Sequence, residues 1–208
     1  MSTNRLHQQI QFILEIDKLK SILRRSYLLN QERHENSAEH SWHLAVMAIL
    51  LHEYVNEQIS LPHVLKMVLV HDLVEIDAGD TYCYDEDANS DKTERELQAA
   101  DRLFAMLPED QGKELRSLWE EFEERSTPEA KFANALDRMM PMMHNYYTRG
   151  KSWKENNVTS DSVLERNSLM QDGSEKLWEF TQSLIEDALK KGYLAPSNKG
   201  GNQDEQIS

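Results

Sequence analysis

The sequence has few of the residues that cross-link a chain or interrupt its helices. Its 208 residues include one cysteine, five prolines and seven glycines. The single cysteine, Cys83, excludes an intrachain disulfide and fits a reducing cytoplasm. So few prolines and glycines argue against an all-β fold with many turns. No apolar run reaches 18 residues and the first residues lack a signal-peptide core, so we expect a soluble, cytoplasmic protein.

Positive charge is scarce as well. Lysine and arginine number 23 against 37 aspartates and glutamates, which gives a formal net charge of −14. Nucleic acid and anionic membranes repel such a chain, so we expect neither as a partner. An anionic small-molecule substrate would need a local positive site.

What the sequence has in abundance is apolar residues at helical spacing. The length fits one domain, and we expect an all-α helical bundle over residues 1–195 with a disordered C-terminal tail at 196–208. Cap residues are expected at Asn36 or Ser37, at Ser60 and at Thr127. The expected helices cover 4–25, 38–57, 61–77, 92–107, 109–125, 128–147, 160–170 and 174–191.

The segment VLVHDLVEIDAGD, at 68–80, places two polar side chains inside the most apolar of these helices. A lone carboxylate in apolar surroundings costs several kcal/mol or takes up a proton, so Asp72 needs a partner. A divalent cation would neutralise Asp72 and use the imidazole of His71. Adjacent helical residues point about 100° apart, so other helices would have to complete the set of ligands.

Candidates for the missing ligands lie on two other helices. His40 shares a stripe with apolar residues of the second helix, and Asp137 lies on the core-directed face of the helix at 128–147. His43 and His144 are alternatives to them, and Asp137 with Arg138 could also form a solvated pair. A mixed nitrogen and oxygen set suits Mn, Fe, Co, Ni or Zn better than Ca.

The order of these residues resembles a known family. His40, then His71-Asp72, then Asp137 is similar to the motif of the HD-domain metal-dependent phosphohydrolases. The match to the HD-domain 5′-deoxynucleotidases is closer and covers about residues 6–190. The residues that carry it are Glu39-His40-Ser41, His71-Asp72-x-x-Glu75, Gly79-Asp80, and Arg24 sixteen residues ahead of His40.

The resemblance implies an HD-domain helical bundle, usually a homodimer, with one divalent metal held by His40, His71, Asp72 and Asp137. It further implies removal of the 5′-phosphate from deoxyribonucleoside 5′-monophosphates by a water that the metal activates. Family members with two metals carry extra histidines between the last two ligand positions, and this chain has none there. The family often has tryptophan immediately, or three positions, after the arginine that matches Arg24. This chain has Arg25 and Tyr27 at those positions, a departure that bears on the preference for sugar and base.

Three further residues have chemistry that suits this reaction. Glu75 could orient the attacking water, and Asp80 could handle the proton of the leaving oxygen; the two roles are interchangeable at this level. Arg24 is the candidate for phosphate binding, because a guanidinium can bind two oxygens at once. The plainer alternatives are that Glu75 is a surface residue at a helix end and that Asp80 is an ordinary loop aspartate.

Two other functions remain open from the residues. One is hydrolysis of a different phosphate ester or of guanosine tetraphosphate. Hydrolases of guanosine tetraphosphate carry an HDxxED-type motif, and this chain has Ile76 where that motif has its second acid. The other is an HD domain that binds a nucleotide without turnover. The presence of every candidate ligand, together with Glu75 and Asp80, favours an enzyme.

Overall fold

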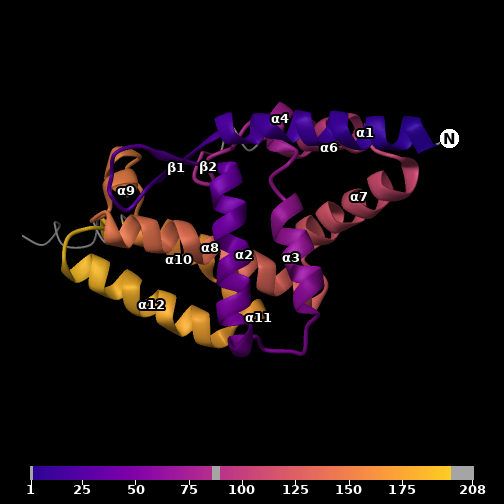
Figure 1. The fold of residues 1–208 in the computed structure, drawn as a ribbon. Coiled ribbons are helices and arrows are strands. Elements are labelled where there is room, and N and C mark those ends of the chain that lie inside the picture. Colours follow the sequence, from indigo (N-terminus) through magenta and orange to yellow (C-terminus); the bar gives the residue numbers. More distant parts are fainter. Residues whose placement is uncertain (1, 86–89, 198–208) are drawn as a thin grey trace, which may run out of the picture.

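The computed structural model describes residues 2–85 and 90–197, and over that range the chain is a helical bundle with one two-stranded hairpin (Figure 1). The elements, in chain order, are α1 (Ser2–Glu15), the 3₁₀ helix η1 (Ile16–Ser21), β1 (Leu23–Tyr27), β2 (His34–Asn36), α2 (Ser37–Leu51), the 3₁₀ helix η2 (His52–Tyr54), α3 (Leu61–Val70), α4 (Glu75–Ala78), α6 (Lys92–Phe104), α7 (Glu109–Glu124), α8 (Pro128–Tyr147), α9 (Lys151–Glu155), α10 (Ser160–Asn167), α11 (Met170–Gly173) and α12 (Glu175–Lys190).

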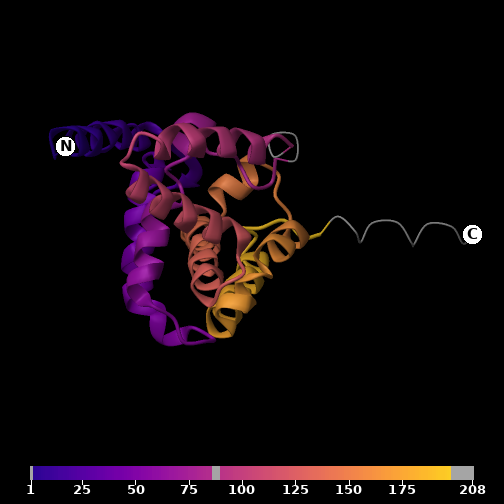
Figure 2. The same cartoon turned by 90° about the vertical axis from the view of Figure 1, so that its right-hand side faces the viewer.

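Helix α8 is the element around which the bundle is assembled. It packs against α2 and α3 on one side and against α11 and α12 on the other. Figure 2 shows these two sides, with α2 and α3 in purple and magenta and α12 in yellow. Leu44, Met67, Phe132, Leu136 and Met140 are fully buried in the shared core. Helices α1 and α6 lie across one end of α2 and α3 (Figure 1).

The predicted all-α fold class is confirmed, and so are two of the predicted caps. Asn36 accepts a hydrogen bond from the Glu39 amide at 2.9 Å, and the Glu39 carboxylate accepts one from the Asn36 amide at 2.8 Å. This reciprocal capping box starts α2. Thr127 caps α8 by accepting from the Ala130 amide at 3.2 Å. Ser60 stands at the cap position of α3 but makes no side-chain cap bond.

The prediction of one helix over 4–25 was wrong at its C-terminal end. Helix α1 stops at Glu15, and after η1 the chain turns into β1, which pairs antiparallel with β2. Arg24 therefore lies on a strand and not at the end of a helix. The apolar spacing continues into this segment, but pairing with residues about ten positions later satisfies its backbone groups. The stabilisation from pairing with a neighbouring strand outweighs the weak intrinsic preference of this segment for a helix.

The predicted helix at 61–77 is interrupted at the residues of most interest. Helix α3 ends at Val70, and the next turn closes with i→i−3 bonds, from Leu73 N to Val70 O and from Glu75 N to Asp72 O, both at 3.0 Å. Helix α4 then runs from Glu75 to Ala78, and Gly79, whose φ is +75°, follows it as the predicted end of the helical segment. His71 and Asp72 thus lie in a tight turn between two helices.

Other differences are smaller. The segment predicted as loop around 148–157 contains the short helix α9, and the helix predicted at 160–170 ends at Asn167. Most of the tail predicted at 196–208, and residues 86–89 of the acidic loop, lie outside the described residues. Among the helices that are described, none is both long and apolar enough to span a membrane.

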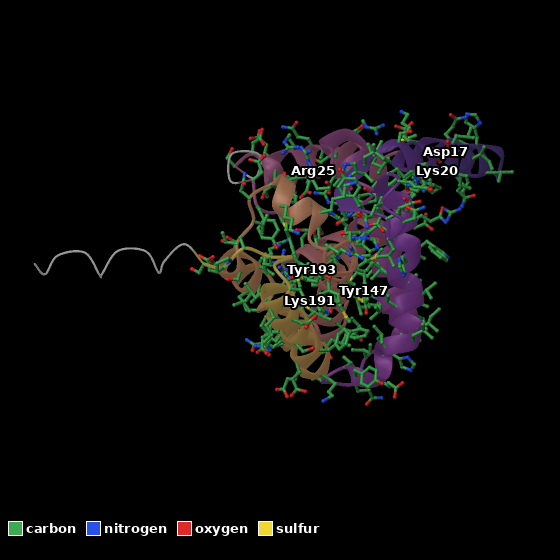
Figure 3. The ribbon with its side chains drawn as sticks, turned by 90° about the vertical axis from the view of Figure 1, so that its left-hand side faces the viewer. Asp17, Lys20, Arg25, Tyr147, Lys191 and Tyr193 are labelled. Atoms are coloured by element: carbon green, nitrogen blue, oxygen red, sulfur yellow. The ribbon has the colours of Figure 1, made fainter. Side chains whose placement is uncertain are left out.

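The chain after α12 is tied to α8 by polar and aromatic contacts. Lys191 donates to the Tyr146 hydroxyl at 2.9 Å, and the Tyr193 ring meets the Tyr146 ring edge-on at 6.1 Å between centroids. Figure 3 shows Lys191, Tyr193 and Tyr147 gathered on this face, well away from the Asp17–Lys20 pair of η1. Gly150 approaches so closely that a Cβ there would lie 1.8 Å from the Tyr193 carbonyl oxygen. Only glycine fits at this approach, and its φ of +72° also favours glycine.

Gly150→Ala is therefore expected to lower the free energy of unfolding by about 3 kcal/mol, or the Tm by about 6 to 12 °C, because strain and overlap add. Gly192→Ala is the matched control, since its φ is +68° but a Cβ there meets nothing within 4 Å. It should cost only about 1 kcal/mol. Thermal unfolding of both variants measures the difference, and equal losses would contradict the close approach.

Candidate functional site

Four predicted ligand side chains, far apart in the sequence, meet at one place in the bundle. They are His40 from α2, His71 and Asp72 from the turn after α3, and Asp137 from α8. His40 Nε2 lies 3.0 Å from Asp137 Oδ1, and His71 Nε2 lies 3.8 Å from the same oxygen. Asp72 Oδ1 is 3.0 Å from His71 Nε2. The packing of α2 and α3 on α8 brings these four side chains together.

Neighbouring groups orient both imidazoles. The Nδ1 atom of His71 lies 2.9 Å from the Val68 carbonyl, which can only accept, so Nδ1 donates this hydrogen bond and Nε2 is the atom available to ligate a metal. His71 Nε2 is buried and makes no hydrogen bond of acceptable geometry, although Asp72 is near. His40 Nδ1 lies 3.3 Å from a carboxylate oxygen of Glu35, which is itself buried. Such carboxylate and carbonyl partners typically orient histidines that ligate metals.

These four residues fit a divalent metal. Two ligands held about 2.1 Å from one ion are about 3.0 to 4.2 Å apart, which spans the separations given above. The unpartnered His71 Nε2 and the carboxylate oxygens around it are the donor types that such an ion takes. Burial alone would raise the pKa of Asp137, but contacts with His40 and His71 bring that pKa well below its ordinary value. Asp137 is therefore ionised and available as a ligand.

Arg24 reaches this group from strand β1. Its Nη1 donates to Asp72 Oδ2 at 2.7 Å, and its Nη2 lies 3.6 Å from Asp137 Oδ1. Burial alone would lower the pKa of Arg24, but the surrounding carboxylates raise it well above its ordinary value. The guanidinium binds the oxygen of Asp72 that faces away from the histidines, so Oδ1 remains directed at them. A permanent positive charge therefore lies beside the candidate metal site.

The two predicted acid–base residues lie in the same neighbourhood. Glu75 Oε2 accepts a hydrogen bond from the Ser37 hydroxyl at 2.6 Å, and its other oxygen lies 4.0 Å from Arg24. Asp80 Oδ1 also lies 4.0 Å from Arg24. Burial, together with the nearby Asp72, raises the pKa of Glu75 well above its ordinary value, and burial raises the pKa of Asp80. Each can hold a proton closer to neutral pH than an exposed carboxyl group can.

The alternative ligands form a separate group. His43 and His144 cluster with Glu35, whose Oε2 lies 3.8 Å from His144 Nδ1. This arrangement separates them from the donor set around Asp137. The notion of a solvated Asp137–Arg138 pair was wrong, since Arg138 is only 5% exposed.

The group opens into a cavity of about 130 Å³. Arg24, Glu75, Asp80 and Asp137 line it, so a molecule in the cavity can touch all of them. Tyr82, Tyr84 and Trp153 contribute aromatic surface, and Arg25 reaches the cavity from β1 beside α9 (Figure 3).

Sequence reasoning did not identify two buried residues that support the site, Glu35 and Ser37. Glu35 orients His40, and Ser37 holds Glu75. Both lie in the segment NQERHENS, which reads as an exposed polar loop. The only signal was their position just ahead of His40, because burial depends on the hairpin that the sequence pattern did not indicate.

Comparison with known proteins agrees with this geometry. The model of the HD domain family matches residues 16–178. A human protein named 5′-deoxynucleotidase HDDC2 is 34% identical over 130 residues, which cover 62% of this chain and 62% of that protein. The bovine protein of the same name is 34% identical over 139 residues, or 66% of each. The chain thus spans less than two thirds of the length of these curated relatives.

Solved structures extend the likeness to nearly the whole chain. A predicted metal-dependent phosphohydrolase from Magnetospirillum magnetotacticum is 48% identical, with a TM-score of 0.91 over 94% of this chain and 98% of its own. A conserved hypothetical protein from Pyrococcus furiosus is 24% identical, with a TM-score of 0.62 over 87% of this chain and 99% of its own, and it shares the fold. The family model matches most of the chain, and the chain belongs to the HD domain family.

Proposed function

We propose that the protein is a metal-dependent phosphomonoesterase that removes the 5′-phosphate from deoxyribonucleoside 5′-monophosphates. The observation that carries this proposal is the convergence of His40, His71, Asp72 and Asp137 beside Arg24. All of these residues except His40 line one cavity. The names of the human and bovine relatives support the substrate, and that of the Magnetospirillum protein supports the reaction class.

In this proposal His40, His71, Asp72 and Asp137 hold one divalent ion of the Mn, Co, Fe, Ni or Zn type. When bound, the ion supplies positive charge for the phosphoryl oxygens and lowers the pKa of a water ligand. The support from the chain is the oriented Nε2 of each histidine and the ionised state of Asp137. The absence of histidine between Asp72 and Asp137 favours one ion over two.

Arg24 is proposed to bind the phosphate. Its Nη1 and Nη2 atoms form a planar fork that matches two phosphate oxygens. The contact with Asp72 at 2.7 Å holds this fork next to the metal ligands, where charge accumulates as the phosphoryl group is transferred. In a chain of net charge −14, such a local clamp is needed to attract an anion at all.

Glu75 and Asp80 are proposed to handle the protons. A water oxygen adds to phosphorus, the bond between phosphorus and the 5′-oxygen breaks, and the leaving oxygen takes up a proton. One carboxylate accepts the proton of the attacking water and the other, protonated, supplies one to the leaving oxygen. The raised pKa of each group supports this chemistry, and the two roles can be exchanged.

The assembly and location of the protein stay predictions. We propose a cytoplasmic homodimer that acts on small nucleotides and binds neither nucleic acid nor membranes. Support for the dimer comes from the large apolar side chains exposed on α1 and α2, which include Leu6, Ile13, Trp42, Ile49 and Leu50. Support for the partner class is the net charge of −14.

The direct test measures phosphate release from matched deoxyribo- and ribonucleoside 5′-monophosphates. Protein stripped of metal should be inactive, and Mn or Co should restore release with a higher kcat/KM for the deoxy series. Mg and Zn complete the metal panel, and a nucleoside 3′-monophosphate serves as the substrate control. Absence of release from every 5′-monophosphate, with metal shown to be bound, would reject the proposed activity.

The ligand assignment is tested by metal content. His71→Gln and Asp137→Asn should each lower the bound Mn or Co from about one ion per chain to well below half, because each removes a donor or a charge from the ion. His43→Gln is the matched control, since His43 clusters with Glu35 and not with Asp137, and it should keep the ion. Elemental analysis after desalting gives the ratio. Loss of metal only in the control would shift the site to the second cluster.

Glu75→Gln should separate chemistry from metal binding. The substitution keeps the shape of the side chain but removes its acid–base function, so kcat should fall by about 10²- to 10⁴-fold with the metal content unchanged. Asp77→Asn changes an exposed carboxylate of the same short helix, where it pairs with Arg102, and should leave kcat within about twofold of the wild type. If kcat survives in Glu75→Gln, this residue has no catalytic role.

A further inference from the structure

Three arginines that line the same cavity have no carboxylate partner among the residues that the structure describes. They are Arg125 at the end of α7, Arg138 in α8 and Arg166 in α10, and we call them the arginine cluster. Within residues 2–85 and 90–197, none of them lies within 4 Å of an acidic oxygen, whereas arginines such as Arg33 and Arg102 form ion pairs. In a chain with 37 acidic side chains, three neighbouring guanidinium groups left without one require an explanation.

Arg138 is the most demanding member of the cluster. It is 5% exposed and follows the candidate ligand Asp137 directly in α8. Its Nη1 donates to the backbone carbonyl of Arg166, and its Nε is buried without a hydrogen-bond partner. Among the described residues Arg138 forms no ion pair, and a buried cation without such a partner is strongly destabilising.

The other acidic residues described in this part of the cavity, Glu96 and Glu123, do not neutralise the positive charge of the arginine cluster. Glu96 is committed to Lys92, with 3.3 Å between the charged atoms. Glu123 also lines the cavity but lies beyond ion-pair distance of the three arginines. The Nε of Arg125 is also buried without a hydrogen-bond partner. Arg125 follows the last residue of α7 and has left-handed backbone geometry, with a φ of +55°. An excess of positive charge therefore faces the cavity here.

We propose that the arginine cluster binds a second anionic group, a phosphate or carboxylate, on the same substrate whose 5′-phosphate is hydrolysed beside Asp137. This inference rests on the proposed function and narrows it to phosphomonoesters that carry a second acidic group, such as deoxyribonucleoside 3′,5′-bisphosphates. Guanidinium groups bind phosphate and carboxylate oxygens in pairs, which suits a converging set of three.

The metal-ligand group and the arginine cluster adjoin along α8, so one ligand can contact both. Asp137 and Arg138 are consecutive residues whose Cα atoms are about 3.8 Å apart, and both line the cavity. The two regions differ in charge, with Asp72, Asp137, Glu75 and Asp80 around the metal ligands and the arginine cluster beyond them. A substrate with two phosphates would offer one anionic group to each region.

The kinetic test compares 2′-deoxyadenosine 3′,5′-bisphosphate with 2′-deoxyadenosine 5′-monophosphate on protein loaded with Mn. The wild type should favour the bisphosphate by at least about tenfold in kcat/KM, mainly through KM. Arg166→Gln and Arg125→Asn should each remove most of this preference; asparagine is chosen because it tolerates the positive φ of residue 125. Arg149→Gln removes an equal charge at an exposed position outside the cavity and should keep the preference.

A binding measurement keeps the two proposals distinguishable. Calorimetry with 2′-deoxyadenosine 3′-monophosphate, which has no 5′-phosphate, should show binding at least about tenfold tighter than that of deoxyadenosine, and Arg166→Gln should abolish the gain. If this gain is present but neither nucleotide is hydrolysed, only the proposed activity fails. If the monophosphate is hydrolysed without preference for the bisphosphate, the inference about the arginine cluster is overturned.

A free anion is the other source of the same chemistry. Inorganic phosphate is therefore titrated alone, into the wild type and into Arg166→Gln. Phosphate that binds the wild type as tightly as the 3′-monophosphate does, and is lost in the variant, would overturn a substrate-linked anion in favour of a free-anion site.

Discussion

The burial of Asp72 is the constraint on which the rest of the site depends. A carboxylate in a turn between two apolar helices is stable only when positive or proton-donating groups surround it. Here Arg24 binds one of its oxygens and His71 lies against the other. The β-hairpin that carries Arg24 and the turn that carries His71 both serve this compensation. In the proposed function, the same concentration of charge that burial makes costly would bind a cation and the oxygens of a phosphate.

Support for the ligands extends beyond the atoms that would touch an ion. Glu35 orients His40, the Val68 carbonyl orients His71, and Ser37 holds Glu75. These partners come from β2, from the first residue of α2 and from the last turn of α3. Because each is fixed by backbone packing, the donor atoms are held in place before any ligand arrives. Such preorganisation reduces the reorganisation needed during the reaction.

Charge is distributed unevenly in the cavity, which has consequences for what it can bind. Carboxylates surround the candidate metal site, while the arginine cluster, which has no acidic partner within residues 2–85 and 90–197, lines the space next to it. In a protein with a net charge of −14, long-range attraction of an anion is weak, so recognition has to come from these local groups. A substrate with negative charge at two positions would satisfy both regions at once.

The sequence by itself determined the helices and the candidate ligands, because these depend on local features. Caps such as Asn36 and Thr127 act within one turn, and the order of His40, His71-Asp72 and Asp137 is visible without a fold. Only the tertiary structure decided that Arg24 lies on a strand, that the helix breaks before His71, and that Glu35 is buried. It alone also brought Arg138 together with two arginines from other helices. Strand pairing, burial and side-chain direction arise from contacts between distant segments, which local patterns do not encode.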